Sequence, residues 1–192
     1  METILRREII VNRATLRVIG VALFVILTSL GAFVRIPLPF TPVPVTLQTF
    51  FVLLGAASLG SGLGALVQAS YILLGVSGLT IFTGAGSGLL YLFGPTGGYL
   101  FGFVLASLFI GRLIKYAKNS FLLFGTFCAA DFILLLTGTI WLKFILGCTF
   151  TKALLIGLTP FIPGDILKAL AASGIYLKLR SRMEKRGESI SW

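Results

Sequence analysis

Residues 36–111, a stretch of 76 residues between Arg35 and Arg112, contain no acidic or basic side chain. Soluble domains carry about 25% charged residues, whereas only 11% of this 192-residue chain is charged and 57% is hydrophobic. A transmembrane helix needs about 20 consecutive apolar residues. The chain is therefore predicted to be an all-α integral membrane protein that forms a single membrane domain over residues 1–192.

Prolines and glycines divide the apolar sequence. Four prolines within residues 36–45 exclude a helix there, and glycines interrupt the next apolar run after residue 60. The six predicted spans are 15–34, 46–60, 63–77, 96–114, 121–145 and 160–180, and the second and third are short for a full crossing. The glycine-rich stretch 78–95 cannot face lipid with unpaired peptide groups, so we expect it to pack on the bundle or line a cavity.

The basic residues indicate how the chain is oriented. With the N-terminus inside, twelve fall on cytoplasmic segments: Arg6, Arg7, Arg13, Arg17, Arg112, Lys115, Lys118, Lys178, Arg180, Arg182, Lys185 and Arg186. Three fall on external segments: Arg35, Lys143 and Lys152. Because cytoplasmic loops are enriched in Lys and Arg, both termini are predicted to be cytoplasmic, in a multi-pass protein of the cell membrane whose glycine-rich stretch is external. The net charge of +10 then reflects topology, and no nucleic-acid partner is expected.

The two ends of the chain complete this organisation. Residues 1–14 are predicted to be a basic N-terminal segment, and residues 181–192 a basic cytoplasmic tail. The first apolar run, residues 18–34, is longer than the apolar region of a usual signal peptide and is not followed by a cleavage site of small residues. It is therefore interpreted as a retained first span.

Ionisable residues inside predicted spans are the strongest candidates for a ligand site. Asp165 and Lys168 are three positions apart in the last span, which places them on one helical face. They are predicted to bind a ligand; the alternative is a helix-capping Asp paired with a Lys. Asp131, in the fifth span, is either a partner for a buried polar group or part of a cavity wall.

Uncharged residues around the second span and the glycine-rich stretch are further candidates. The amide of Gln48 can recognise a planar, amide-like ligand or hydrogen-bond a neighbouring helix. The aromatic residues Phe82, Tyr91, Phe93 and Tyr99 either form an interfacial belt or line a pocket. Glycines such as Gly94 would allow the backbone to approach a small ligand closely.

No sequence pattern indicates catalysis. The chain has no His and only two Cys, so metal-ligand and nucleophile–base motifs are missing, and it has no nucleotide-binding loop. No cofactor or metal site is predicted. Ala14, Val18 and Ala22 recur every four positions along the first span, so this side of the helix suits close packing within the bundle or against a partner helix.

Three sequence blocks occur along the chain: PVPVTLQT at 42–49, LFGPTGGYLFG at 92–102 and PFIPGDILK at 160–168. Together they resemble the BioY family, the biotin-specific S components of energy-coupling-factor transporters, and the resemblance extends over residues 14–180. The resemblance implies a six-helix membrane protein that binds biotin from outside and associates with a T component and two cytoplasmic ATPases.

The same resemblance implies roles for individual residues. It assigns ligand binding to Gln48, the segment 91–99, Asp165 and Lys168, and Phe82, Gly94 and Asp131 complete the predicted site. It assigns docking of the T component to a small-residue pattern on the first helix, here degraded to Ala14, Val18 and Ala22.

Two other functions are considered beside biotin binding. The first is binding of a related ligand, lipoate or dethiobiotin, by the same fold. The second is a small membrane enzyme, which is disfavoured because only Asp131 and Asp165 supply acidic groups within the spans and His is absent.

The predicted topology has a direct test. In a variant whose two native cysteines are replaced by serine, a cysteine at position 87 should react with an impermeant thiol reagent added to intact cells. A cysteine at position 118 should react only after the membrane is opened. Reaction at position 118 in intact cells would contradict the predicted orientation.

Overall fold

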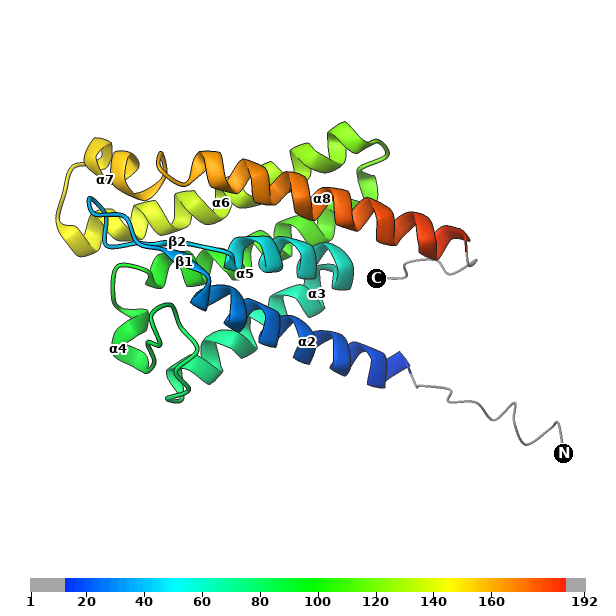
Figure 1. Cartoon of the computed structure of the whole chain (residues 1–192), viewed down its shortest axis with the longest axis horizontal. Helices are drawn as coiled ribbons and strands as arrows, with labels where there is room; N and C mark the ends of the chain where they lie inside the picture. The colour runs from blue at the N-terminus through cyan, green and yellow to red at the C-terminus, as the bar shows by residue number, and fades with distance from the viewer. Residues whose placement is uncertain (1–12, 186–192) are drawn as a thin grey trace, which may run out of the picture.

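A computed structural model describes residues 13–185, which form a bundle of helices (Figure 1). The elements in chain order are α2 (Arg13–Phe33), β1 (Arg35–Ile36), β2 (Val45–Thr46), α3 (Gln48–Val76), α4 (Leu89–Leu92), α5 (Gly97–Leu113), η1 (Ile114–Tyr116), α6 (Ser120–Leu146), α7 (Phe150–Gly157) and α8 (Ile162–Lys185). The start of α2 and the end of α8 lie at the same end of the bundle, called here the terminal end. The β1–β2 hairpin, α4 and α7 lie at the opposite end, the loop end.

The proline-rich segment after α2 is not helical, as predicted. It forms a short hairpin. β1 and β2 pair antiparallel, with Arg35 opposite Thr46 and Ile36 opposite Val45. Proline has no N–H to donate to a strand ladder, so the pairing stops where the prolines begin. The hairpin lies across the loop end of the bundle (Figure 1).

Helix α3 turns back on itself at Gly60, whose φ of 83° interrupts the helical backbone. In a straight helix, Gln48 and Tyr71 would be separated by about 35 Å at 1.5 Å per residue. Instead, the amide nitrogen of Gln48 donates a hydrogen bond of 2.7 Å to the Tyr71 hydroxyl. The two limbs, residues 48–59 and 61–76, are therefore antiparallel neighbours, which confirms the predicted division of this apolar run.

The close contact between the limbs depends on glycine. A Cβ on Gly64 would lie 2.7 Å from the Cα of Ala56, so a side chain there would push the limbs apart. Gly111, near the end of α5, meets the turn of α3 in the same way, because its Cβ would lie 2.2 Å from the backbone nitrogen of Ser61.

The glycine-rich loop, residues 77–96 between α3 and α5, is irregular apart from the short helix α4. Gly78, Gly84 and Gly88 all have positive φ, a conformation that L side chains rarely adopt. A single β-bridge between Phe82 and Gly86 closes a tight turn within the loop. The loop joins the second limb of α3 to α5 at the loop end.

The sequence prediction missed helix α7, which precedes α8 and is bent from it by 51°. The side chain of Thr149 caps α7 by accepting a hydrogen bond of 3.4 Å from the Lys152 N–H. Pro163 falls in the first turn of α8, where a missing N–H breaks no helical hydrogen bond. α8 continues to Lys185, so the first residues of the predicted tail 181–192 are helical, whereas 186–192 and most of the predicted segment 1–14 lie outside the described residues.

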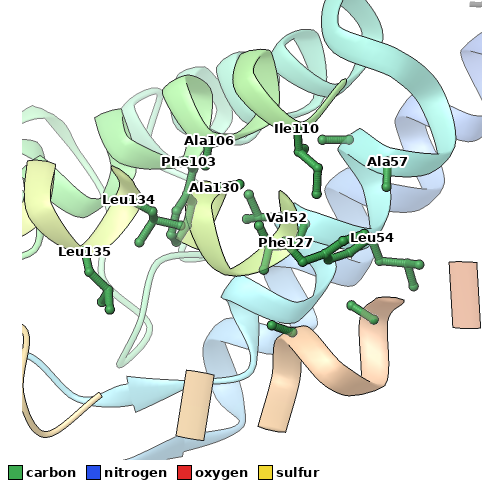
Figure 2. Packing of buried hydrophobic residues seen from close by; sticks show 14 of the residues in the cluster. Val52, Leu54, Ala57, Phe103, Ala106, Ile110, Phe127, Ala130, Leu134 and Leu135 are labelled. Carbon is green, nitrogen blue, oxygen red and sulfur yellow. The ribbon is translucent and has the colours of Figure 1, made fainter. Parts of the chain in front are cut away.

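The core lies between the first limb of α3, α5 and α6 (Figure 2). Val52, Phe103 and Phe127 come from these three helices in turn, and each is at most 4% exposed. α5 approaches α6 closely because Gly102 faces the backbone of Leu134, where a Cβ would lie 2.8 Å from the carbonyl oxygen.

The described part of the chain has four helices that are long and apolar enough to cross a membrane, or up to five if the bent pair α7 and α8 forms one span. The expected number of six requires the two limbs of α3 to count separately, and it stays a prediction. The outer surface is rich in apolar side chains, including Leu90, Phe121 and Phe144, which are 88%, 83% and 71% exposed. Such a surface is typical of a protein embedded in lipid.

Candidate functional site

A cavity lies inside the loop end, beneath the hairpin and the glycine-rich loop, and is called here the main cavity. It is lined by Val43, Pro44, Thr46, Gln48, Thr49, Thr83, Tyr91, Thr96, Tyr99, Leu100, Phe103, Leu134, Leu135, Phe161, Asp165 and Lys168. The hairpin, α3, the glycine-rich loop, α5, α6 and α8 all contribute to this wall. The volume is about 50 Å³, whereas ligand pockets usually measure about 300–1,000 Å³. The hairpin and the glycine-rich loop are therefore in a closed arrangement over the site.

Asp165 and Lys168 form an ion pair on one face of α8, as their spacing predicts. The pair is fixed to the start of α3. Thr49 donates a hydrogen bond of 3.2 Å to Asp165 Oδ1, and Lys168 donates to the Thr49 hydroxyl at 2.7 Å and to the Thr46 carbonyl at 2.9 Å. Lys168 thus directs its three N–H bonds at three acceptors within the protein.

Asp165 is only 2% exposed, and its second oxygen, Oδ2, has no hydrogen-bond partner among the described residues. A buried carboxylate oxygen without a donor is costly, at about 1–3 kcal/mol or more. A donor that reaches Oδ2 from a cavity that Asp165 borders would remove this cost.

Asp131 lies in a second cavity of about 160 Å³ between α6 and α8, which is also lined by Cys128, Phe132, Leu135, Ile162, Asp165, Ile166 and Ala169. Asp131 is not among the residues that line the main cavity, and its Oδ1 has no hydrogen-bond partner in the described part of the chain. Leu135 and Asp165 border both cavities, so the cavity that holds Asp131 adjoins the main cavity.

The Gln48 side chain connects α3 to the glycine-rich loop. Its amide nitrogen donates to Tyr71, whose hydroxyl in turn donates to the Ile81 carbonyl at 3.1 Å. Its amide oxygen accepts from Thr83 at 3.1 Å and from Thr46 at 3.3 Å. Gln48 is 3% exposed, so it lines the cavity, but most of its hydrogen-bonding capacity holds the loop in place.

Two of the four predicted aromatic residues line the main cavity; Phe82 and Phe93 do not, and Phe93 is 58% exposed. Tyr91 and Tyr99 line the main cavity, and their hydroxyls donate to the carbonyls of Thr83 at 3.1 Å and Gly157 at 2.6 Å. Phe82 is fully buried and stacks on Tyr91 with ring centroids 4.8 Å apart, outside the cavity lining. Phe82 therefore anchors the glycine-rich loop.

Gly94 was predicted to belong to the ligand site, but it does not line the main cavity. Its carbonyl oxygen accepts a hydrogen bond of 3.0 Å from the indole nitrogen of Trp141 on α6. This bond fixes the end of the glycine-rich loop to the bundle. The described residues contain no cluster of three or more metal-ligating side chains.

Comparison with known proteins decides the family. The model of the BioY family matches residues 5–185.

The chain belongs to the BioY family.

Its relatives match over most of their length. The biotin transporter BioY of Thermotoga maritima is 38% identical over 85% of this chain and 95% of that protein. The probable biotin transporter BioY of Pyrococcus horikoshii is 41% identical over 79% of this chain and 88% of that protein. A solved structure, the S-component for biotin from an ECF-type ABC transporter, superposes with a TM-score of 0.82 at 27% identity, over 88% of this chain and 93% of that one.

The small residues on α2 of this BioY chain do not pack inside the bundle. Ala14, Val18 and Ala22 are all exposed, Val18 by 68%. Val18 and Ala22 border an apolar groove of about 440 Å³ between α2 and the second limb of α3, whose other lining residues are Arg17, Val21, Val25, Ile26, Leu63, Leu66, Ser70 and Leu74. This side of α2 is therefore not used for packing within the bundle, which was the alternative interpretation of the small residues.

Several residues that build the BioY site were not predicted from the sequence. Thr46 and Thr49 bind Lys168, Thr83 binds Gln48, and Tyr71 joins both limbs of α3 to the loop. Thr46 and Thr49 belong to the same sequence block as Gln48, so their position in the block could have indicated that they are site residues. Nothing near Tyr71 in the sequence indicates its partners, because they depend on the turn at Gly60.

The hydrogen bonds of Tyr71 should control how easily the glycine-rich loop opens. Tyr71→Phe removes the bonds to Gln48 and Ile81, each worth about 1 kcal/mol, so amide hydrogen exchange across residues 77–96 should quicken about 30-fold. Mass spectrometry of exchanged peptides would measure this rate. Tyr116→Phe, at a hydroxyl on a 64% exposed residue, is the matched control, and equal exchange in the two variants would contradict the assigned role.

Proposed function

We propose that this BioY chain binds biotin in the main cavity and acts as the substrate-binding subunit of an ATP-driven uptake system in the cell membrane. The observation that carries the proposal is the free Oδ2 of Asp165, a buried acceptor at a cavity with aromatic walls. The names of the relatives and of the solved neighbour support it, because they are transport proteins for biotin and not enzymes.

The chemistry of biotin matches this cavity. Its ureido group carries two N–H donors, and Asp165 has an unused acceptor for them. Its fused rings are apolar apart from the ureido group, and Tyr99, Phe103 and Phe161 provide apolar surface in the wall. Lys168 has its three donors engaged, so its role is to neutralise Asp165 and hold it in place.

The same contacts discriminate between the alternative ligands. Lipoate has no ureido group, so it would leave the Asp165 acceptor unsatisfied. Dethiobiotin keeps the ureido group but has no thiophene ring, so it would bury less apolar surface against the aromatic wall. Biotin uses both features of the cavity.

Binding requires the cover of the cavity to move. The cavity of about 50 Å³ is too small for biotin in its closed arrangement. The hairpin and the glycine-rich loop are held to the bundle by hydrogen bonds such as those of Gln48 and by buried side chains such as Val43 and Phe82. We infer that these two segments swing outward to admit the ligand and close over it.

We further propose six spans with both termini in the cytoplasm. The limbs of α3 run in opposite directions and supply two short crossings, and α7 with α8 supplies the last. Arg17, Arg112, Lys115, Lys118, Lys178, Arg180 and Arg182 belong to segments at the terminal end, whereas Arg35, Lys143 and Lys152 belong to segments at the loop end. The excess of positive charge supports a cytoplasmic terminal end and an external main cavity.

The partners that we propose are a membrane-embedded T component and two cytoplasmic ATPases. The chain has no nucleotide-binding loop, so ATP hydrolysis must come from other subunits. The exposed face of α2 with its apolar groove is suited to a partner helix, because Ala14 and Ala22 allow close approach.

Asp165→Asn should weaken biotin binding about 10- to 100-fold, because a hydrogen bond to a charged group is worth about 1.5–3 kcal/mol. Titration calorimetry on the purified protein would measure the affinity. Glu184→Gln, which neutralises an exposed acid at the other end of α8, is the matched control. Lys168→Ala should also weaken binding, but the double variant should lose less than the sum of both losses, because Lys168 acts through Asp165. Unchanged affinity in a folded Asp165→Asn variant would refute the site.

Ala22→Trp should prevent assembly without disturbing the ligand site. A bulky side chain there would fill the groove beside α2 and hold a partner helix away. Co-purification of the T component and ATPases with the tagged chain should fall sharply, while biotin affinity stays unchanged. Ala129→Trp, on the exposed surface of α6, serves as the control, and normal assembly of Ala22→Trp would show that another face docks.

A further inference from the structure

The main cavity has no cation available for an acidic ligand. Among the residues that the structure describes, Lys168 is the only basic one in its wall, and its three donors are directed at Asp165, Thr46 and Thr49. Asp165 offers only acceptor oxygens, so a second carboxylate beside it would find no donor there. A ligand that carries one carboxylate must therefore direct it away from Asp165, toward the cover of the cavity.

Arg35 lies where the two segments of that cover meet. It stands opposite Thr46 in the β1–β2 hairpin, and paired residues of an antiparallel ladder project to the same face. Its guanidinium rests on the glycine-rich loop, with Nη1 2.6 Å from the position that a Cβ of Gly84 would occupy. Because Thr46 and Thr83, the neighbour of Gly84, both line the main cavity, Arg35 is at its rim.

The guanidinium of Arg35 is free to bind a ligand. No hydrogen bond or ion pair engages it among the described residues, and the residue is exposed. The other cations of the loop end are elsewhere: Lys143 lies over the ring of Phe144, 5.1 Å from its centroid, and Lys152 is exposed on α7. Neither borders the main cavity.

We propose that Arg35 binds the carboxylate of the ligand at the rim of the main cavity. The inference rests on the proposed function, and it sets the ligand's orientation: the ureido end lies at Asp165 and the acid end beneath the hairpin and the glycine-rich loop. Arg35 touches both of these segments, so the bound carboxylate also favours their closed arrangement. Gly84 is part of this site, because a side chain there would displace the guanidinium.

The test compares biotin with biotin amide, which keeps the ureido group and the rings but has no charged acid. In the unaltered protein, biotin should bind about tenfold more tightly than the amide, the lower end of the range for a charged hydrogen bond at an exposed rim. Arg35→Gln should lose this preference, with biotin weakened about tenfold and the amide unchanged within twofold. Arg35→Lys should keep part of the preference, and Lys152→Gln, the control for loss of an external charge, should keep all of it.

Each other outcome overturns the proposal. If Arg35→Gln weakens both ligands equally, Arg35 only holds the hairpin against the loop. If it weakens neither, the carboxylate is bound elsewhere. If the unaltered protein binds neither ligand, the proposed function itself fails, and this result is distinct because it does not depend on any substitution at Arg35.

Discussion

Burying the carboxylate of Asp165 in an apolar bundle would cost several kcal/mol without compensation, and the arrangement around it reduces this cost. Lys168 supplies the opposite charge, while Thr49 and the Thr46 carbonyl satisfy the remaining donors of Lys168 and one oxygen of Asp165. This set joins the start of α8 to the start of α3. One carboxylate oxygen stays without a donor, so the protein carries part of the desolvation cost before a ligand arrives. In the proposed complex, a ligand with N–H donors would recover this cost, and the site would select for that chemistry.

The turn at Gly60 creates the space in which this pair can act. The limbs of α3 have roughly 12 and 16 residues, or about 18 Å and 24 Å at 1.5 Å per residue, which is shorter than the hydrocarbon core of about 30 Å. The loop end is therefore covered by the hairpin and the glycine-rich loop instead of by helices. In a membrane protein, non-helical backbone is tolerated where it packs on protein or lines a cavity. Gln48 and Tyr71 provide that packing through hydrogen bonds to the loop.

The sequence predicted those features that depend on local patterns. Prolines excluded a helix after α2, the glycines at 60, 62 and 64 indicated the division of α3, and the spacing of Asp165 and Lys168 placed them on one face. Features that depend on the tertiary arrangement were not predictable from one sequence. Phe82 and Gly94 were predicted to bind the ligand. In the structure, Phe82 stacks on Tyr91 and Gly94 accepts a hydrogen bond from Trp141. Asp131 is on the same face of α6 as Leu134 and Leu135 but one turn earlier, so it lines the second cavity and not the main one. The contact of Arg35 with Gly84 likewise joins segments that meet only in the folded protein.

The central claim is that the free oxygen of Asp165 receives the ureido group of biotin. The most direct measurement is an experimental structure of the protein with biotin bound, at a resolution that defines the orientation of the rings. The account predicts a ureido nitrogen about 2.7–3.2 Å from Asp165 Oδ2, with the Asp165–Lys168 pair intact and the hairpin and glycine-rich loop closed over the ligand. Biotin bound outside the main cavity, or with its ureido group turned away from Asp165, would contradict it.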